Sequence, residues 1–372
     1  MRQKRILTFA NHLGPVGGSE IAQLNILRGL AARGWEIHLL YVSSGEFWSE
    51  WQALAATTTR IRASLPARSS PVASTFGVFR AGIAGMRCWP SVIYVHNAGD
   101  VPIGLGVAKV AGASVVAHLH LPPGSRQPNW LNALIRRTAA VIAPSSDTAE
   151  RWVTAARLAP DRISVIPTGV DIDRFAPLGT DERAAVRVGL DVGIDDWMVL
   201  YAGRLSPEKG AHYLIEAVRQ IPFAVHVVLC GLASDRAYLD RLKEEAIASN
   251  AAFLGLRSDV PSLMGAADLV VVPSDSPDAQ PLVISEALAC GTPVIASNVG
   301  GISDSMKGFP EQLVAPGDPM QLAKLIERYL RWRTSEPELG GRSRQWAVEH
   351  MTLDASTEMV NKILTRALDH GR

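Results

Sequence analysis

The stretch ADLVVVPSDSPDAQPLVISEALACGTPVIASNVGG, residues 267–301, decides the fold class. An apolar, β-branched run over 269–272 ends in a short polar loop, and a second apolar run, typical of a buried strand, starts at Pro293. Between the runs, Pro281 opens a short helix that Gly291 closes, because proline suits the first helical position and glycine the residue just past the last. The order strand, loop, helix, strand predicts one unit of a parallel sheet.

The same alternation of apolar runs and helical stretches continues along the whole chain, which is typical of a doubly wound α/β fold. The first run of each half leads into a glycine loop and a helix, with GPVGGSE at 14–20 and GRLSPEKG at 203–210. Two such openings predict two Rossmann-like domains in tandem. We expect strands at 5–10, 36–42, 91–96, 114–120, 140–144 and 163–166, and then at 198–202, 225–229, 252–254, 269–272 and 294–296.

The segment IPTGVDIDRFAP, residues 166–177, interrupts this periodicity with proline and glycine and marks the domain boundary. We expect a first domain over 1–170 and a second over 171–352. The remaining residues, 353–372, predict an amphipathic helix that packs back on the first domain.

Composition excludes several classes of protein. The 37 basic and 36 acidic residues nearly cancel, so the overall charge does not indicate nucleic-acid binding. Cys88, Cys230 and Cys290 lack the spacing of a metal site or a disulfide framework, which predicts reduced thiols and no metal. No apolar run is long enough to span a membrane, and polar Asn11 and His12 follow the first one. We expect a cytoplasmic protein that is at most peripheral on the inner membrane face.

Charged side chains surround the predicted helix start in the second domain. Asp278 in the loop and Glu286 in the helix flank an N-terminus whose unpaired N–H groups favour anions. Arg204 and Lys209 in the second glycine loop suit a diphosphate, because arginine binds as a fork and lysine as a point charge. Taken alone, this pair also fits a solvated loop. Ligands of open α/β folds bind at the carboxyl ends of the strands.

The first glycine loop fits a dinucleotide poorly. Gly17 and Gly18 do not complete GxGxxG, and the second strand, LLYVSSG at 39–45, has no acid for a ribose. The glycines still let backbone approach a phosphate closely, although an ordinary tight turn explains them as well.

In their order and spacing, Gly17-Gly18, GRLSPEKG and residues 273–301 resemble the retaining glycosyltransferases of family GT4, which have the GT-B fold. IPTGVDIDRFAP resembles the family's interdomain segment and VAPGDPMQLAKLI, residues 314–326, its late segment, so the resemblance covers nearly the whole chain. It implies two Rossmann-like domains that face each other across a cleft, with the C-terminal helix crossing back to the first.

The resemblance also implies roles for individual residues. Arg204 and Lys209 match the pair that holds the donor diphosphate and stabilises the leaving group, so that no metal and no other cofactor is required. Glu286 matches the second acid of the family's E-x7-E motif, which binds the donor ribose. Asp278 stands where the family has the first Glu, and Ala279-Gln280-Pro281 replaces its Gly-Phe-Gly, which puts the donor sugar in doubt more than the reaction.

Backbone and histidine contacts to the donor follow from the same resemblance. His120 matches the active-site histidine that orients the donor sugar, while His118, two residues earlier, is better explained as a buried, hydrogen-bonded side chain. Gly17 and Gly18 match the loop that closes over the donor. The helix start that meets the sugar and phosphate is matched by Gln280, Pro281, Leu282 and Val283.

A basic, aromatic stretch in the first domain is the one indication about the acceptor. No acid occurs between Glu50 and Asp100. The stretch suits a phosphorylated acceptor or an anionic membrane surface, and equally a solvated helix face with its arginine stems on the core. Its members are Arg60, Arg62, Arg68, Arg80 and Arg87, with Trp51, Phe76, Phe79 and Trp89 between them.

The resemblance predicts an enzyme that moves a sugar from a nucleoside-diphosphate sugar, by family habit a UDP-sugar, to an acceptor hydroxyl with retention. The expected acceptor is a bacterial surface glycan, a glycolipid or a small natural product. Three alternatives remain at this point: a sugar-nucleotide 2-epimerase of the same fold, a phosphorylase of similar architecture, and a non-catalytic sugar-nucleotide binder.

Overall fold

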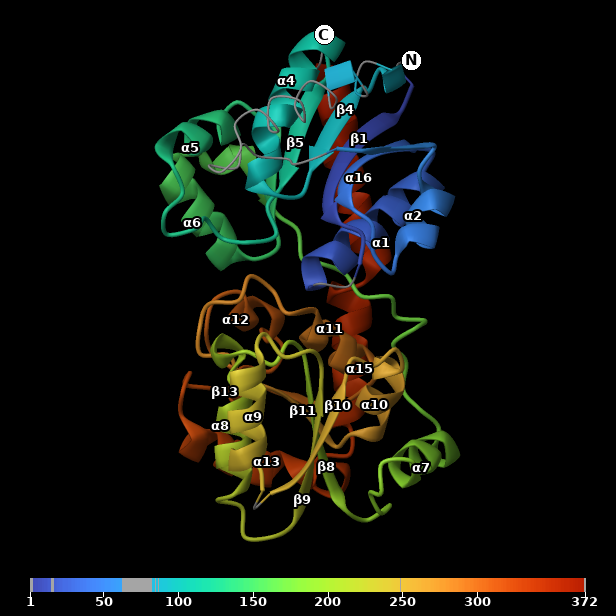
Figure 1. Ribbon diagram of the computed structural model, residues 1–372. Coiled ribbons are helices and arrows are strands. Elements are labelled where there is room, and N and C mark those ends of the chain that lie inside the picture. The colour runs from blue at the N-terminus through green and yellow to red at the C-terminus, as the bar shows by residue number, and fades with distance from the viewer. Residues whose placement is uncertain are drawn as a thin grey trace. The chain divides into compact units, whose positions relative to one another are not determined.

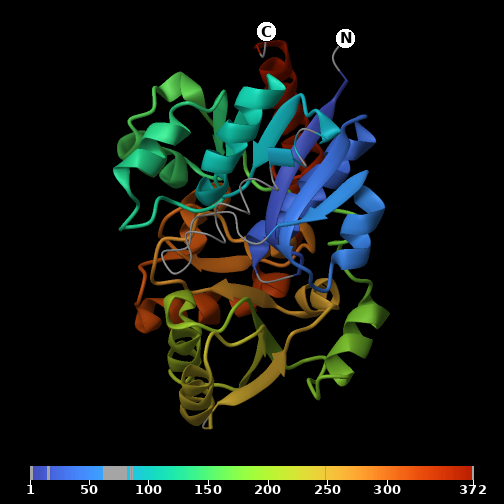
Figure 2. The ribbon, with the colours of Figure 1, turned by 45° about the horizontal axis from the view of Figure 1, so that its top comes forward.

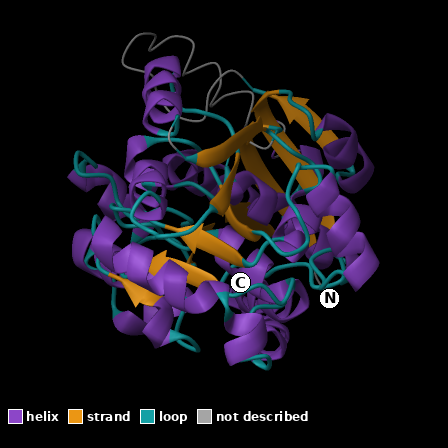
Figure 3. Ribbon diagram, turned by 90° about the horizontal axis from the view of Figure 1, so that it is seen from below, coloured by secondary structure: helices purple, strands orange, loops and turns teal. Residues whose placement is uncertain are grey.

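A computed structural model of the chain describes residues 3–14, 17–61, 82–83, 85, 87–247 and 249–370, the side chain of residue 370 excepted. The chain divides into two compact units (Figure 1). Unit 1 comprises Met1–Thr168 and Leu353–Arg372, and unit 2 comprises Gly169–Thr352. Both are Rossmann-like, with helices lying against a parallel sheet (Figure 3).

The sheet of unit 1 contains seven strands among the described residues, in the order β3-β2-β1-β4-β5-β6-β7. All of its recorded strand pairs are parallel, with Ile6 opposite Ile37 and Tyr94 opposite Val116. The direction of strand order reverses between β1 and β4, which is where open α/β sheets bind ligands. The strands are β1 (Arg5–His12), β2 (Glu36–Ser43), β3 (Thr57–Arg60), β4 (Val92–Val95), β5 (Ser114–His118), β6 (Ala140–Ala143) and β7 (Ile163–Val165).

The C-terminal helix α16 (Leu353–His370) belongs to unit 1, where it runs against α1 (Gly18–Ala32) (Figures 1 and 2). Arg33, just past α1, bonds Asp354 at 2.5 Å and Glu358 at 3.1 Å. The apolar face of α16 enters the core of the unit, as its sequence pattern predicts. The other helical segments are α2 (Trp48–Leu54), η1 (Ala98–Asp100), α4 (Val101–Ala111), α5 (Asn129–Ile135), α6 (Ser146–Ala156) and η2 (Pro160–Arg162).

The sheet of unit 2 contains six parallel strands within the described residues, in the order β10-β9-β8-β11-β12-β13. Its strand order reverses between β8 and β11. The strands are β8 (Trp197–Ala202), β9 (Val225–Cys230), β10 (Asn250–Gly255), β11 (Leu269–Val272), β12 (Val294–Ser297) and β13 (Leu313–Val314).

Helices of unit 2 pack on this sheet and on one another (Figure 1). Those that follow β8 and β11 in the chain are η3 (Pro207–Lys209), α8 (Ala211–Val218) and α11 (Leu282–Ala289). The others are α7 (Thr180–Val188), α9 (Arg236–Glu245), α10 (Val260–Ala266), α12 (Ile302–Ser305), η4 (Pro310–Gln312), α13 (Pro319–Leu330), α14 (Trp332–Ser335) and α15 (Leu339–His350).

A buried carboxylate ties distant parts of unit 2 together. Asp268, 2% exposed, precedes β11 and accepts bonds from Arg183 at 2.6 Å and Arg187 at 3.4 Å. Arg333 donates to the same carboxylate at 3.4 Å, and the backbone N–H of Met198 also donates to it, at 2.9 Å. A buried charge is tolerated when it is paired and hydrogen-bonded in this way.

The expected strands are all present, but their ends shift and two further strands appear. The strand expected to run to His120 ends at His118. Pro281 is the residue before α11, with extended backbone (φ −72°, ψ 120°), so the helix begins at Leu282 and the prediction that proline occupies the first helical position is wrong by one residue. β3 and β13 were missed because TTTR has no apolar alternation and β13 has only two residues.

Candidate active site

Two loops of unit 2 are held together above the carboxyl ends of β8 and β11. Gly210 closes the GRLSPEKG loop with φ +70°, and a Cβ there would lie 1.9 Å from the carbonyl oxygen of Pro273. Only glycine permits this approach. The backbone N–H of Asp275 donates to the carbonyl of Glu208 at 3.2 Å, which joins the two loops a second time.

The most direct contact between predicted site residues is the ion pair of Lys209 and Asp278, in which the ammonium bonds the carboxylate. Asp278 is itself fixed by the loop after β12, because its carbonyl accepts from the N–H of Gly301 at 2.7 Å. Gly300, at φ +58°, leaves no room for a Cβ, which would lie 2.7 Å from that same carbonyl. Three adjacent strands, β8, β11 and β12, therefore position one cation and one carboxylate.

Arg204 lies in the same loop as Lys209 but is exposed and pairs with Glu208 at 3.0 Å. The Arg204 carbonyl accepts from the buried Tyr201 hydroxyl at 2.7 Å, which anchors the loop. Burial opposes ionisation of Glu208, but the pKa of this carboxyl is lowered by its backbone N–H, by Ser206 and by the two cations. Both cations were predicted from the sequence, but their acidic partners were not. Arg204 pairs with Glu208, and Lys209 pairs with Asp278.

Glu286 lies inside α11, partly buried, and burial raises the pKa of its carboxyl to about 7. The charge that opposes this shift is Arg174, in the segment at the domain boundary. Arg344 holds that segment against α11, since its guanidinium donates to the carbonyls of Phe175 at 2.7 Å, Ile172 at 3.0 Å and Ala289 at 2.8 Å. The electrostatic link from Arg174 to Glu286 was not visible in the sequence.

The start of α11 presents backbone donors beside this carboxylate. Pro281 precedes the helix and has no polar side chain to cap it, so the first-turn N–H groups of Leu282 and Val283 depend on partners from outside the helix. Gln280 stands directly before Pro281. This arrangement is receptive to an anion or to hydroxyl oxygens.

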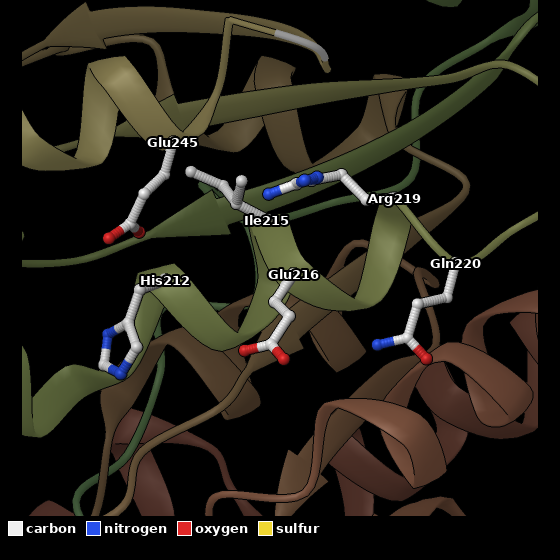
Figure 4. Close-up of a pocket in the computed structure, with 6 residues that line it drawn as sticks. All are labelled: His212, Ile215, Glu216, Arg219, Gln220 and Glu245. Atoms are coloured by element: carbon white, nitrogen blue, oxygen red, sulfur yellow. The ribbon is translucent and has the colours of Figure 1, made fainter.

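A depression of about 540 Å³ is present on unit 2 (Figure 4). His212 and Glu216 come from α8, and Glu245 faces them from the end of α9. The His212 ring bonds the Tyr238 hydroxyl at 3.1 Å. The lining of the depression contains none of the predicted site residues.

In unit 1, the predicted His120 belongs to a buried group of rings at the ends of β4 and β5. Its Nε2 lies 3.0 Å from Nδ1 of His96. His118, which ends β5, bonds the hydroxyl of Tyr94 through Nδ1 at 2.7 Å, in keeping with the hydrogen-bonded role expected for it. His96 was missed, although it follows β4 just as His120 follows β5, and the adjacent strand ends could have indicated it.

The three histidines also form a group that could hold a metal ion, because one ring nitrogen of each lies within 4.8 Å of the others. Imidazole nitrogens suit zinc and related ions. Burial lowers the pKa of His120 to about 4, and burial with the neighbouring imidazoles lowers the pKa of His96 and of His118 well below the ordinary value. All three rings are therefore neutral near pH 7.

Gly17 and Gly18 lie at the N-terminus of α1, with Gly17 as the residue before the helix in extended conformation. Glycine has no side chain to cap the helix, so the first-turn N–H groups there can meet a ligand. Residues 15 and 16 of the same loop lie outside the described residues.

Only part of the basic stretch can be placed. Arg62, Arg68, Phe76, Phe79 and Arg80 lie outside the described residues. Trp51 is 2% exposed and packs in the core, whereas Trp89 is 58% exposed. Arg60 donates to the carbonyl of Val42 at 3.2 Å, and Arg87 is exposed. Trp51 is therefore a core residue and does not belong to an exposed aromatic surface.

Two family models account for most of the chain. The model described as "Glycosyltransferase Family 4" matches residues 16–174, and the one described as "Glycosyl transferases group 1" matches residues 187–346. The chain belongs to glycosyltransferase family GT4. The boundary between the two matches falls close to the division between the two units.

Similar proteins agree with this assignment. A protein of Xylanimonas cellulosilytica named "D-inositol 3-phosphate glycosyltransferase" is 29% identical over 84% of this chain and 83% of its own length. A Mycobacterium tuberculosis protein of the same name is 34% identical over 51% of this chain, and the match spans only 41% of that relative.

Solved structures of similar proteins have the same GT-B fold. Anabaena HepE in complex with UDP has a TM-score of 0.84 at 23% identity and covers 97% of this chain and 100% of its own. HepE has also been solved with UDP-glucose. Within the described residues of the GT4 enzyme, no helix is both long and apolar enough to cross a membrane.

Proposed function

We propose that this GT4 enzyme transfers a sugar from a nucleoside-diphosphate sugar to an acceptor hydroxyl, with retention at the anomeric carbon and without a metal. The observation that carries the proposal is the ion pair of Lys209 and Asp278 at the point where the strand order of unit 2 reverses. Two residues that the family resemblance singled out independently meet at the edge where such sheets bind ligands.

The donor proposed first is a UDP-sugar. Arg204 and Lys209 lie on one loop, so the oxygens of a diphosphate bound there would accept hydrogen bonds from both cations. Glu286 would accept from the ribose hydroxyls, and the N–H groups at the start of α11 would meet the phosphate and sugar. Support for uridine comes from HepE, whose structures hold UDP and UDP-glucose.

In the transfer step, the bond between the anomeric carbon and the diphosphate oxygen breaks, and the acceptor oxygen bonds to the same face of that carbon. The acceptor proton passes to the departing diphosphate. Arg204 and Lys209 stabilise the negative charge that grows on the leaving group, which takes the role that a metal has elsewhere. Neither Asp278 nor Glu286 needs to act as a nucleophile, so the two-carboxylate mechanism of glycosidases does not apply.

For the acceptor, we propose a molecule with an anionic group, in surface-glycan or glycolipid synthesis. The relatives named D-inositol 3-phosphate glycosyltransferase support a phosphorylated acceptor, as does the absence of acids from residues 51–99 of the sequence. We place the enzyme in the cytoplasm, with peripheral membrane contact for a lipid acceptor. Cys88, Cys230 and Cys290 are free and buried, which fits a reducing compartment.

Thermal unfolding with UDP, GDP and ADP, and then with their sugars, tests the donor site. A ligand at about 100 times its Kd stabilises the fold by about 2.7 kcal/mol, which corresponds to several degrees in Tm. We expect a shift with UDP and UDP-sugars that is lost in Lys209→Ala. No shift with any nucleotide, or an undiminished shift in the variant, would contradict the assignment.

The reaction itself is tested by NMR of the products. With acceptor present, we expect UDP release and a glycoside with the anomeric configuration of the donor. Epimerisation of the donor without any acceptor would favour the 2-epimerase. Sugar phosphate formed from a glucan and inorganic phosphate would favour the phosphorylase.

A further inference from the structure

Four aromatic side chains at the carboxyl ends of β4 and β5 form two hydrogen-bonded pairs. Tyr94 bonds Nδ1 of His118 at 2.7 Å, and His96 bonds His120 through Nδ1 and Nε2 at 3.0 Å. The rings of His96 and His120 are nearly parallel, 7° apart, and the ring of His118 lies 4.1 Å from that of His120. The rings therefore support one another sterically as well as through hydrogen bonds.

The environment keeps all three imidazoles uncharged. His118 is 0%, His96 2% and His120 6% exposed. Burial is the main cause of the lowered pKa in all three rings, and a charged His120 would further lower the pKa of His96 and of His118. A neutral imidazole carries one proton, so each ring has one donor nitrogen and one acceptor nitrogen.

The buried nitrogens without partners decide which ring of the His96–His120 pair donates. Nε2 of His96 is buried and has no hydrogen-bond partner among the described residues. If His120 donated to His96, the proton of His96 would lie on that Nε2 as a buried N–H without an acceptor. Orphaned buried N–H groups are rarer than unpaired acceptors. The favourable arrangement therefore has His96 donating from Nδ1, with only a lone pair left at its Nε2.

We propose that His96 is a positioning residue that donates to Nε2 of His120 and so keeps the proton of His120 on Nδ1. This rests on the proposed function for its consequence in the reaction. With its proton on Nδ1, His120 offers a hydrogen-bond donor from that atom, suited to a hydroxyl oxygen of the donor sugar. It is neither a free base nor a cation. The hydrogen bond from His96 thus selects what His120 can do, because a hydrogen bond to one ring nitrogen fixes the role of the other.

The tautomer can be read directly from long-range 1H–15N spectra of the unliganded enzyme labelled with 15N-histidine, with EDTA present to remove metal. The variant His96→Phe keeps an aromatic ring but removes the donor. In His96→Asn, the side-chain amide places an N–H donor close to the position of Nδ1 and should rescue the bond. The matched control is Tyr94→Phe, which removes the hydroxyl bonded to His118 and leaves the His96–His120 pair intact.

We expect His120 to carry its proton on Nδ1 in the wild type, in Tyr94→Phe and in His96→Asn, and to move toward the Nε2–H form in His96→Phe. Turnover of His96→Phe should fall on the order of tenfold, the worth of one neutral hydrogen bond. KM for the donor should change little, and His96→Asn should recover most of the loss. Thermal unfolding confirms that each variant is folded.

A wild-type spectrum with the proton of His120 on Nε2 would overturn the proposal, and it needs no variant to fold. An unchanged tautomer in His96→Phe would also overturn it. Because the spectra require no activity, they separate this inference from the proposed function. A changed tautomer with undiminished turnover would retain the hydrogen-bond assignment and remove His120 from the reaction.

Discussion

Lys209 and Asp278 are 69 positions apart in the sequence, and their side chains form an ion pair. The pair exists because β8 and β11 are neighbours in the sheet of unit 2, so the loops that follow them share one edge. Gly210 allows the backbone of these two loops to approach closely, and Gly300, in the loop after β12, allows the same at Asp278. The pair places a cation and a carboxylate where the donor diphosphate and sugar are proposed to bind.

Removal of either loop cation should impair catalysis as well as donor binding. Lys209→Ala and Arg204→Ala should each lower kcat by about 10²–10³-fold, because preorganised charge acts on the leaving group in the transition state. Steady-state kinetics with a UDP-sugar checks this. The matched control is Arg219→Ala, an exposed arginine at the depression of Figure 4 that should keep full activity. Near-wild-type activity in both loop variants would mean that the site is elsewhere.

The carboxylate of Asp278 should matter through the lysine that it holds. In Asp278→Ala the ammonium of Lys209 loses its partner, so we expect kcat to fall on the order of tenfold or more, the scale of one charged hydrogen bond. Asp278→Glu should restore activity in part and change the preference among UDP-sugars, measured as relative kcat/KM. Asp240→Ala, in an exposed pair on α9, provides the control. If Asp278→Ala is fully active, this acid has no part in the transfer.

Protonation of Glu286 should make both stability and donor binding depend on pH. Burial raises the folded-state pKa of this carboxyl from 4.5 to about 7. The folded state therefore holds the proton more tightly than the unfolded chain, and the resulting stability is lost as the pH rises toward and through about 7. Glu286→Gln should thus raise Tm relative to wild type more at about pH 8 than at about pH 5.

Donor affinity should follow the opposite trend, since the ionised carboxylate is the better acceptor for ribose hydroxyls. In the wild type, the Kd of a UDP-sugar should rise as the pH falls below about 7, and in Glu286→Gln it should not change with pH. Calorimetry should use a UDP-sugar rather than UDP, because a terminal phosphate itself titrates near about pH 6. Equal pH dependence in both proteins would exclude Glu286 as the titrating group.

Metal removal tests whether the three buried histidines are needed as metal ligands or whether His120 acts on the sugar without a metal. If Arg204 and Lys209 neutralise the leaving group, EDTA should leave turnover unchanged within error. Excess zinc should reduce turnover, because His96, His118 and His120 can offer nitrogen ligands that would withdraw His120 from the sugar. Activity that EDTA abolishes and zinc restores would instead make this group an essential metal site.

The buried carboxylate of Asp268 should be essential for the stability of unit 2. Asp268→Ala leaves Arg183, Arg187 and Arg333 without their shared partner, and removal of one member of a buried ion pair costs about 3–5 kcal/mol. Urea unfolding measures the loss. The control Asp147→Ala breaks an exposed helical pair with Arg151 and should cost about 0.3–0.5 kcal/mol. A similar small loss in both variants would show that the arginines find other partners.

The parallel α/β architecture and the two domains could be predicted from the amino-acid sequence, and most of the candidate site residues were proposed from it. Strand periodicity, the proline and glycine at the ends of α11, and the cations of the GRLSPEKG loop are local features, encoded within a few residues of one another. Local signals also explain the errors, because TTTR in β3 has no apolar alternation and Pro281 fits the position before a helix as well as the first position in it.

Which of these residues are partners could not be predicted from the sequence, because it depends on the tertiary structure. The contact of Lys209 with Asp278 depends on strand order, and so does the pairing of His96 with His120 from the neighbouring strands β4 and β5. The same is true of Asp268, which collects arginines from three different segments. Periodicity specifies which face of an element is buried, but not which element lies beside it. The chemistry of this enzyme's candidate site arises from those neighbours.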